Sequence, residues 1–293
     1  MKRFGLSVAL ATPFETDGKI AIEAMTTQAK RCLAAGCNSI TLFGTTGEGS
    51  SIGTRERESV IEQVLKAGIA PDQIVVGVLV DAAEDAAEHA RFALEKGARN
   101  ILLAPPSYFK NVSDDGLFAW FSSVFDQIGD KARDIIVYNI PSVTMVALSV
   151  SLIGRLRQAF PQIVAGVKDS SGDWPYTETL LKSHGDLIIL IGDERHLARG
   201  VQQGGQGAIS GMANFLPNEV RVMAEQGQDD SRIESFVGEL LKYPVTPAVK
   251  TMVSLLTGEE LWLTVRAPLV SITTEEREKL RNAFDALFRA KAA

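Results

Sequence analysis

The sequence predicts an α/β protein, a (β/α)₈ TIM barrel with additional C-terminal helices. Short apolar runs alternate strictly with longer amphipathic stretches, and eight such units follow one another along the chain. The runs are nearly continuous in hydrophobicity, which is typical of parallel strands that are covered on both faces. Eight alternating units of this kind favour a single parallel barrel.

Eight short apolar runs, most of them rich in Ile and Val, are the expected strands. They lie at residues 7–11, 39–43, 74–79, 100–104, 134–138, 163–168, 187–191 and 207–210. A doubly wound open sheet is the alternative, but it usually has fewer strands and a Gly-rich phosphate-binding turn, which ATPFETDG after the first run is not. We expect residues 1–227 to form the barrel and residues 228–293 to form a helical extension packed on it, as a single structural unit.

The amphipathic stretches between the runs have recognisable helix ends. Thr54, Asp81 and Ser113 are expected to begin three of the helices, because Ser, Thr and Asp are favoured N-cap residues. Arg57 stands where a capping box would place Glu, so only the N-cap itself favours a helix start at Thr54. Gly36 is the expected end of the first helix, since glycine is the favoured residue after a helix C-terminus.

The composition is that of a globular protein that can bury a large core. The 293 residues are 45% hydrophobic and 23% charged, with a formal net charge of −6. The acidic balance gives no electrostatic reason to expect a nucleic-acid partner. No apolar stretch approaches the ~20 residues of a membrane span, so no membrane association is expected. Two cysteines, Cys32 and Cys37, are too few for a disulfide framework and favour a reducing, cytoplasmic location.

A lysine and a tyrosine end two neighbouring strands, where a barrel carries its catalytic groups. Lys168 follows IVAGV, five residues without charge, so burial there would disfavour the ammonium and favour a neutral amine. A neutral amine can attack a ketone carbonyl and form an imine. Tyr138 ends the preceding strand, so its phenol can converge with the amine and both donate and accept a proton. A strand-end lysine that reaches solvent and a core aromatic are the simpler structural interpretations.

Other polar groups are expected at the same edge of the barrel. The segment Gly44-Thr45-Thr46-Gly47-Glu48 follows the second strand and offers hydroxyl and backbone N–H groups that can hold a carboxylate. Gly192, Asp193 and Glu194 follow the seventh strand. The two carboxylates there would bind substrate hydroxyls or a metal, or would simply begin the next helix.

A metal-dependent aldolase is a second enzyme hypothesis. It would use Asp193, Glu194 and His196 as ligands, but three ligands within four residues cannot easily close round one ion. We therefore expect no metal and no other cofactor, since an imine through Lys168 would carry the chemistry.

Five motifs occur in a fixed order along the expected strands. They are Thr12-Pro13-Phe14, the GTTGE segment at 44–48, Tyr138-Asn139-Ile140-Pro141, the GVKDSSG segment at 166–172 and the GGQGAIS segment at 204–210. Together they resemble the dihydrodipicolinate synthase / N-acetylneuraminate lyase family over essentially the whole chain. The resemblance implies a class I, Schiff-base aldolase or lyase that acts on pyruvate or a related 2-keto acid together with an aldehyde or sugar-acid partner.

The resemblance also implies roles for individual residues. Lys168 is similar to the family's Schiff-base lysine, and Tyr138 is similar to its general acid/base tyrosine. Thr46 matches the threonine that binds the keto-acid carboxylate, and Thr45 matches the one that relays protons. Ile209 resembles the residue whose backbone lies over the substrate.

A further match concerns assembly. Tyr108 resembles the relay tyrosine that one subunit lends to its neighbour, although the surrounding PPSYFKN is not the commonest family form. Members of the family are usually homotetramers, assembled as dimers of tight dimers. The resemblance therefore implies a homotetramer for this chain.

One departure from the family pattern leaves the second substrate open. Synthases of the lysine pathway carry Arg two residues after the Pro of the Tyr-Asn-x-Pro motif, whereas this chain has Val143. Valine cannot supply a bidentate clamp for the carboxylate of aspartate semialdehyde, unless Arg195 compensates from another direction. Sialic acid lyases also lack this arginine, and their Asp-Glu pair resembles Asp193-Glu194.

Four functions therefore remain as alternatives. The chain would be a dihydrodipicolinate synthase-like enzyme, a 2-keto-3-deoxy sugar acid or 4-hydroxy-2-oxoglutarate-type aldolase or dehydratase, an N-acetylneuraminate lyase-like enzyme, or a barrel that only binds a keto acid. The last is disfavoured because the lysine, the tyrosine and both threonines are all present.

Overall fold

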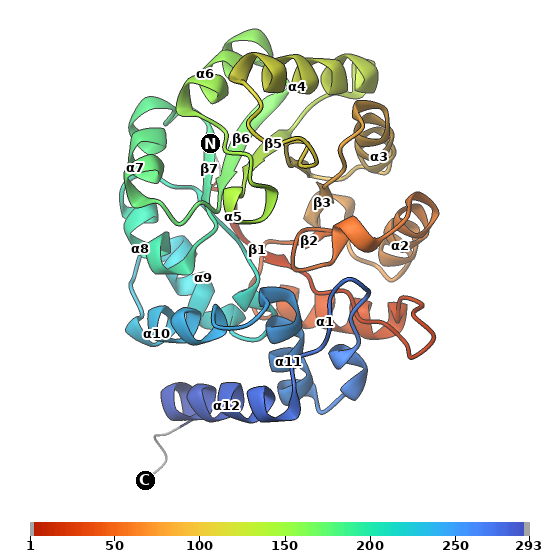
Figure 1. Ribbon diagram of the computed structural model, residues 1–293, viewed down its shortest axis with the longest axis vertical. Helices are drawn as coiled ribbons and strands as arrows, with labels where there is room; N and C mark the ends of the chain where they lie inside the picture. The colour runs from red at the N-terminus through yellow and green to blue at the C-terminus, as the bar shows by residue number, and fades with distance from the viewer. Residues whose placement is uncertain (1–2, 290–293) are drawn as a thin grey trace.

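Eight parallel strands close into a barrel in the computed structural model, which describes residues 3–289. The strands follow chain order around the barrel, and β8 pairs with β1. They are β1 (Gly5–Ala9), β2 (Ser39–Leu42), β3 (Ile74–Val78), β4 (Asn100–Leu103), β5 (Ile135–Asn139), β6 (Val164–Asp169), β7 (Ile188–Ile191) and β8 (Gly207–Ser210). Each strand lies within two residues of its predicted bounds, and the predicted fold class is confirmed (Figure 1).

Helices surround the barrel and continue beyond it. They are α1 (Ile22–Ala34), α2 (Thr54–Lys66), α3 (Ala83–Glu95), α4 (Asp114–Ile128), α5 (Pro141–Thr144), α6 (Val150–Ala159), α7 (Trp174–Ser183), α8 (Glu194–Gln202), α9 (Pro217–Gln226), α10 (Ser231–Leu240), α11 (Val245–Thr257) and α12 (Thr274–Phe284). Short turns of helix lie at η1 (Gly49–Ser51), η2 (Pro71–Gln73), η3 (Gly129–Lys131), η4 (Met212–Asn214), η5 (Glu260–Leu263) and η6 (Asp285–Arg289).

Two helix starts differ from the predicted ones. Gly53 rather than Thr54 is the N-cap of α2, and its backbone N–H donates to the Glu56 carboxylate at 3.2 Å. The prediction took Thr54 as the N-cap and so found Arg57 at the capping-box position. With Gly53 as the N-cap, that position is held by Glu56. Asp81 does not begin α3, because its carboxylate accepts the backbone N–H of Tyr108, in the loop after β4, at 3.3 Å.

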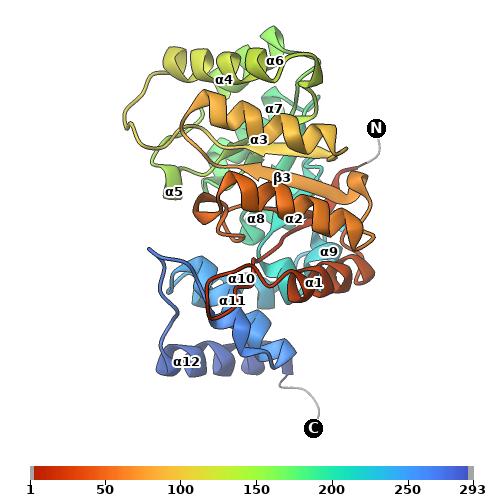
Figure 2. The same ribbon diagram turned by 90° about the vertical axis from the view of Figure 1, so that its right-hand side faces the viewer.

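The C-terminal helices share a hydrophobic core with the outer layer of the barrel. One cluster of buried apolar side chains includes Leu197 of α8, Phe236 of α10, Val249 of α11 and Phe284 of α12. Helix α10 packs against α8, and α11 packs against η4 behind β8. Figures 1 and 2 show α10, α11 and α12 gathered at the end of the molecule opposite α4 and α6. The division at residue 227 and the folding of both parts as one unit stay predictions.

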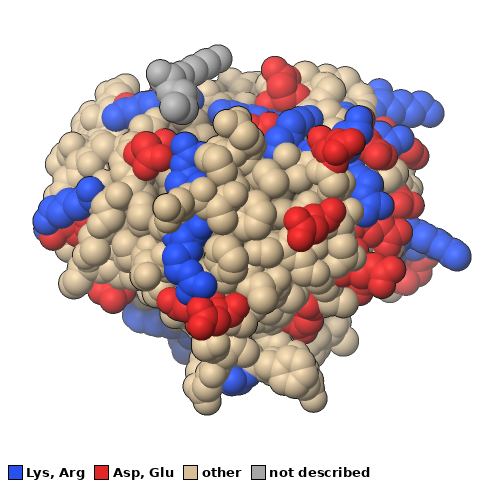
Figure 3. All heavy atoms as spheres, turned by 90° about the horizontal axis from the view of Figure 1, so that it is seen from above, with Lys and Arg blue, Asp and Glu red and all other residues tan. Residues whose placement is uncertain are grey.

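The surface carries both kinds of charge. Blue and red side chains are interspersed on the face over α4 and α6, and neither sign forms a continuous patch there (Figure 3). Within residues 3–289, no helix combines the length and the apolar character that a bilayer crossing requires.

Candidate active site

Lys168 and Tyr138 meet at the carboxyl ends of β6 and β5. The two residues are register partners on adjacent strands, and the Lys168 Nζ lies 3.1 Å from the Tyr138 Oη. Both are buried, with 6% of Lys168 and 2% of Tyr138 exposed. The amine also lies 4.3 Å from the centroid of the tyrosine ring. The predicted convergence of amine and phenol is therefore present in the structure.

The residues that follow these two tie the strand ends together. Asn139 and Asp169 are register partners, and the Asn139 Nδ2 donates to the Asp169 Oδ1 at 3.0 Å. The other carboxylate oxygen accepts from the Thr177 hydroxyl of α7 at 2.5 Å, and the Asn139 Oδ1 accepts the Leu148 N–H at 3.0 Å. These supporting residues were not identified from the sequence. The sequence does contain a clue to them: a polar residue directly follows both Tyr138 and Lys168, and a buried polar group needs a hydrogen-bond partner.

The turn after β2 brings Thr45 to the same place. Its hydroxyl lies 3.4 Å from the Tyr138 Oη, and Thr46 beside it is buried. Gly47 lies behind the turn, where the Thr12 hydroxyl donates to its carbonyl at 2.7 Å. A Cβ at Gly47 would lie 2.8 Å from the Leu10 carbonyl oxygen, so only glycine fits this close approach. Gly47 shapes the turn and is not among the residues that line the cavity beside it.

A cavity of about 310 Å³ opens beside these groups. Nearly all the predicted site residues line it, namely Thr45, Thr46, Tyr138, Lys168, Gly192, Asp193, Glu194 and Ile209. Apolar residues from the extension, among them Val237, Leu240 and Val249, complete the wall. A cavity of this size, mostly apolar and with a few convergent polar groups, suits a small organic ligand.

The two carboxylates after β7 have different environments. Glu194 is half-buried and accepts a hydrogen bond from the Ser210 hydroxyl at 2.5 Å. Burial raises its pKa, opposed by that hydrogen bond and by the Lys168 charge. Asp193 instead forms a bidentate ion pair with Arg195 at 2.9 and 2.6 Å. Burial favours a higher pKa for Asp193, but the hydrogen bonds from Arg195 outweigh it and the pKa is lowered.

Val143 and Arg195 also line this cavity. Val143 lies in the short helix α5 and is well exposed. Both nitrogens of the Arg195 guanidinium that face Asp193 are used by the ion pair. The ion pair thus holds the Nε/Nη2 side of the Arg195 guanidinium toward Asp193.

Tyr108 lies apart from the cavity of its own chain. Its ring is 77% exposed, in the loop after β4, and packs edge-on against the exposed Phe109 ring with 5.3 Å between centroids. A second cavity of about 350 Å³ lies between this loop and the site, with Ser107 and Thr45 among its lining residues. Thr45 thus borders both cavities.

Among residues 3–289, no group of three or more His, Cys, Asp and Glu side chains is arranged to hold a metal ion. The three residues of the metal hypothesis are engaged otherwise. Asp193 pairs with Arg195, Glu194 bonds with Ser210, and the His196 ring packs against Trp174 with 5.6 Å between centroids.

The chain is similar to known proteins along nearly its whole length. The model of the dihydrodipicolinate synthetase family matches residues 2–287. The chain is 68% identical to dihydrodipicolinate synthase from Agrobacterium tumefaciens, with a TM-score of 0.97 over 98% of this chain and 100% of that one. It is 31% identical to the 4-hydroxy-tetrahydrodipicolinate synthase of Thermus thermophilus, covering 93% of this chain and 92% of the relative. An uncharacterised DapA-like lyase of Chloroflexus aurantiacus is 29% identical, over 97% of this chain and 96% of the relative. The chain therefore belongs to the dihydrodipicolinate synthetase family and is a lyase, as its motifs predicted.

Proposed function

We propose that the protein forms an imine between Lys168 and the C2 carbonyl of pyruvate or a related 2-keto acid. The observation that carries this proposal is the buried Lys168 amine, 3.1 Å from the Tyr138 hydroxyl, on the wall of a 310 Å³ cavity. An amine attacks a carbonyl only in its neutral form, and the phenol is the group within hydrogen-bond distance that can take up and return a proton. The chemistry needs no cofactor.

The reaction would run in balanced steps. The Lys168 nitrogen attacks C2, a C–N bond forms as the C=O π bond opens, and one proton passes from the nitrogen to the oxygen. That oxygen leaves as water after a second proton transfer, which gives an iminium. Loss of a C3 proton gives an enamine, whose C3 attacks an aldehyde carbon in condensation; the reverse sequence breaks the bond between C3 and C4. Tyr138 would move the protons at the nitrogen and oxygen, and Thr45 would relay them, as the 3.1 Å and 3.4 Å distances between these groups support.

The turn at Thr45 and Thr46 is the proposed site for the keto-acid carboxylate. It presents a hydroxyl and backbone groups to the cavity that Lys168 also lines. Such donors stabilise an anion without a formal positive charge. Gly192, directly after β7, and Ile209 of β8 would also contact the substrate, since both line the cavity.

We propose a hydroxylated 2-keto acid or sugar acid for the part of the substrate beyond C3. Val143 offers no side-chain donors, Arg195 is paired with Asp193, and Glu194 presents a half-buried carboxyl that can bond with a hydroxyl group. Condensation of pyruvate with aspartate semialdehyde is the second candidate. It is favoured by the synthase names of the relatives from Agrobacterium tumefaciens and Thermus thermophilus.

We also propose a homotetramer in which a neighbouring copy brings Tyr108 to the site. Tyr108, Phe109, Val143, Met145 and Val270 are large apolar side chains exposed in the single chain. Exposed apolar groups of this kind favour association with another protein surface. A second copy covering them would place its own Tyr108 near Thr45, which borders the 350 Å³ cavity.

Exchange of the pyruvate methyl protons with deuterated water tests enamine formation without any second substrate. The rate of exchange, followed by proton NMR, should rise with enzyme and saturate with pyruvate. Lys168→Met should abolish it, whereas Lys182→Met, a change of the same kind on the exposed end of α7, should leave it unchanged. Exchange that persists in Lys168→Met would contradict the proposal.

A further inference from the structure

A buried ion pair joins the C-terminal extension to the turn that carries Thr45. The Lys250 Nζ of α11 lies 2.7 Å from the Glu48 Oε1, and neither side chain is exposed to solvent. Glu48 follows Thr45-Thr46-Gly47 directly, and its φ of 54° lies in the left-handed region. Glu48 is the last residue of the turn, and the ion pair holds it in this uncommon backbone conformation.

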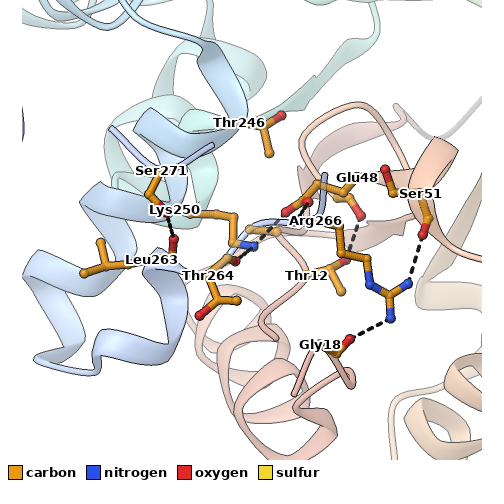
Figure 4. A network of polar contacts seen from close by, with 12 residues as sticks. Thr12, Gly18, Glu48, Ser51, Thr246, Lys250, Leu263, Thr264, Arg266 and Ser271 are labelled. Carbon is orange, nitrogen blue, oxygen red and sulfur yellow. Dashed lines mark hydrogen bonds and ion pairs between the residues drawn. The ribbon is translucent and has the colours of Figure 1, made fainter. Parts of the chain in front are cut away.

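The same helix holds the beginning of the turn. Thr246 lies one turn before Lys250 in α11, and its hydroxyl donates to the Thr45 carbonyl at 3.1 Å. That carbonyl also accepts the Glu48 N–H at 3.1 Å, which closes the turn on itself. Figure 4 shows Thr246 and Lys250 on one helix, with Lys250 directed at Glu48 across the boundary between the extension and the barrel. Helix α11 therefore holds both ends of the segment that positions the Thr45 hydroxyl.

Arg266 completes the attachment from the segment after η5. Its backbone N–H donates to the second Glu48 oxygen at 2.9 Å. Its guanidinium forms a bidentate pair with Glu56 of α2 at 2.7 and 2.5 Å and donates to the Ser51 carbonyl at 2.9 Å. Both cations lie against the Phe14 ring, at 4.5 Å for Lys250 and 4.6 Å for Arg266. Two cations thus face two carboxylates. Figure 4 shows Lys250 and Arg266 on either side of Glu48.

Such a pair is costly to bury. Desolvation lowers the pKa of Lys250 to about 8, although the Glu48 charge opposes that shift. Replacing a buried ion pair by apolar residues is often neutral or stabilising, so stability alone is a weak reason for its presence. The pair supplies a directed contact to one Glu48 oxygen, which apolar residues cannot make, and the Arg266 N–H binds the other oxygen. Together the two contacts favour one orientation of the turn.

We propose that Lys250, Glu48 and Thr246 are positioning residues that hold the Thr45 hydroxyl in place for proton transfer with Tyr138. The C-terminal helices thereby serve as part of the active site's support. The inference rests on the proposed imine chemistry and adds the residues that orient its proton relay. Thr45 is the group through which they act, because its hydroxyl lies 3.4 Å from the Tyr138 Oη.

Thr246→Val is the first test, because it removes one hydroxyl and keeps the shape of the side chain. The saturating rate of pyruvate methyl exchange should fall roughly two- to tenfold, the effect of one lost hydrogen bond. The pyruvate concentration for half-saturation should stay the same, since Thr246 is not among the residues that line the cavity beside Lys168. Thr257→Val makes the same change at the exposed end of α11 and should exchange at the wild-type rate.

The double variant Glu48→Gln/Lys250→Met is the second test, because it removes both charges and leaves neither one buried alone. We expect a folded protein whose exchange rate is at least about tenfold lower, while borohydride still attaches pyruvate to Lys168. Wild-type exchange in the folded double variant would overturn the inference, and so would equal rates in Thr246→Val and Thr257→Val. The latter comparison decides alone if the double variant does not fold. Absence of a pyruvyl adduct in the wild type would instead overturn the proposed function.

Discussion

The Lys168 amine and the Tyr138 hydroxyl lie 3.1 Å apart because the two residues are register partners on adjacent parallel strands. Their geometry is set by the backbone ladder of the barrel and by the Asn139–Asp169 bond one residue farther along. A catalytic pair on rigid strands keeps its spacing better than one on loops. The relationship makes the phenol the nearest proton carrier for chemistry at the amine.

Removal of the Tyr138 hydroxyl should therefore strongly slow enamine formation. In Tyr138→Phe, the saturating rate of methyl exchange should fall roughly 10²- to 10⁴-fold, the range for lost acid/base help, while the far-UV spectrum and thermal midpoint stay close to wild type. Tyr243→Phe removes a hydroxyl outside the site and serves as the control. A Tyr138→Phe protein with near-normal exchange would show that the phenol is only structural.

The second substrate is tested by a direct comparison of kcat/KM. At least one 2-keto-3-deoxy sugar acid or hydroxy-keto acid should be processed with a higher kcat/KM than aspartate semialdehyde. Val143→Arg should raise kcat/KM for aspartate semialdehyde roughly 10- to 150-fold, because it adds charge-assisted hydrogen bonds to a carboxylate. The opposite result would be a wild type that condenses efficiently with aspartate semialdehyde and loses this activity in Arg195→Ala. That result would contradict the prediction and show that Arg195 binds the carboxylate of aspartate semialdehyde.

The role of Tyr108 is tested by complementation between subunits. Tyr108→Phe and Lys168→Ala should each be poorly active alone. Co-expressed, they should regain activity in mixed assemblies, because a chain with intact Lys168 receives Tyr108 from its neighbour. Assemblies would be separated by orthogonal affinity tags and their mass measured by light scattering. Activity that stays at the level of the single variants, or a monomer in solution, would contradict the shared site.

His89 should make the protein less stable in mild acid. Burial lowers its pKa to about 4, and the Arg57 charge acts in the same direction. The unfolded chain, with a pKa near the ordinary value of 6.5, binds more protons between these limits. The free energy of unfolding should therefore fall as pH drops from about 6.5 to about 4. Urea unfolding at both pH values should show a smaller loss of unfolding free energy in His89→Gln than in the wild type. An equal loss in the two proteins would mean that His89 does not titrate between these pH values.

The strands and the central pair were predictable because their signals are local. Each strand is a continuous apolar run, and Lys168 and Tyr138 stand directly at the ends of two of them. Ser113 caps α4 as predicted, since its hydroxyl accepts from the same helix. Asp81 has the same cap-forming chemistry, but a loop after β4 takes its carboxylate, and that contact is not local.

The contacts that hold the site residues in place could not be predicted, because they too join residues that are not neighbours in the sequence. Lys250 and Glu48 are 202 residues apart in sequence, and no periodic pattern links them. The Asp193–Arg195 pair depends on side-chain orientation at a helix start, which sequence spacing does not fix. Because this pair holds one side of the Arg195 guanidinium, it affects which second substrate the cavity can bind.

Borohydride trapping is the most direct test of imine formation at Lys168. The protein would be incubated with pyruvate, reduced, digested and mapped by mass spectrometry, with a sample lacking pyruvate as control. Reduction adds a hydride to the C=N carbon and leaves a stable secondary amine. We expect one pyruvate-derived group per chain, on the peptide that contains Lys168. A group attached to any other lysine, or no adduct with pyruvate and several other 2-keto acids, would contradict the mechanism.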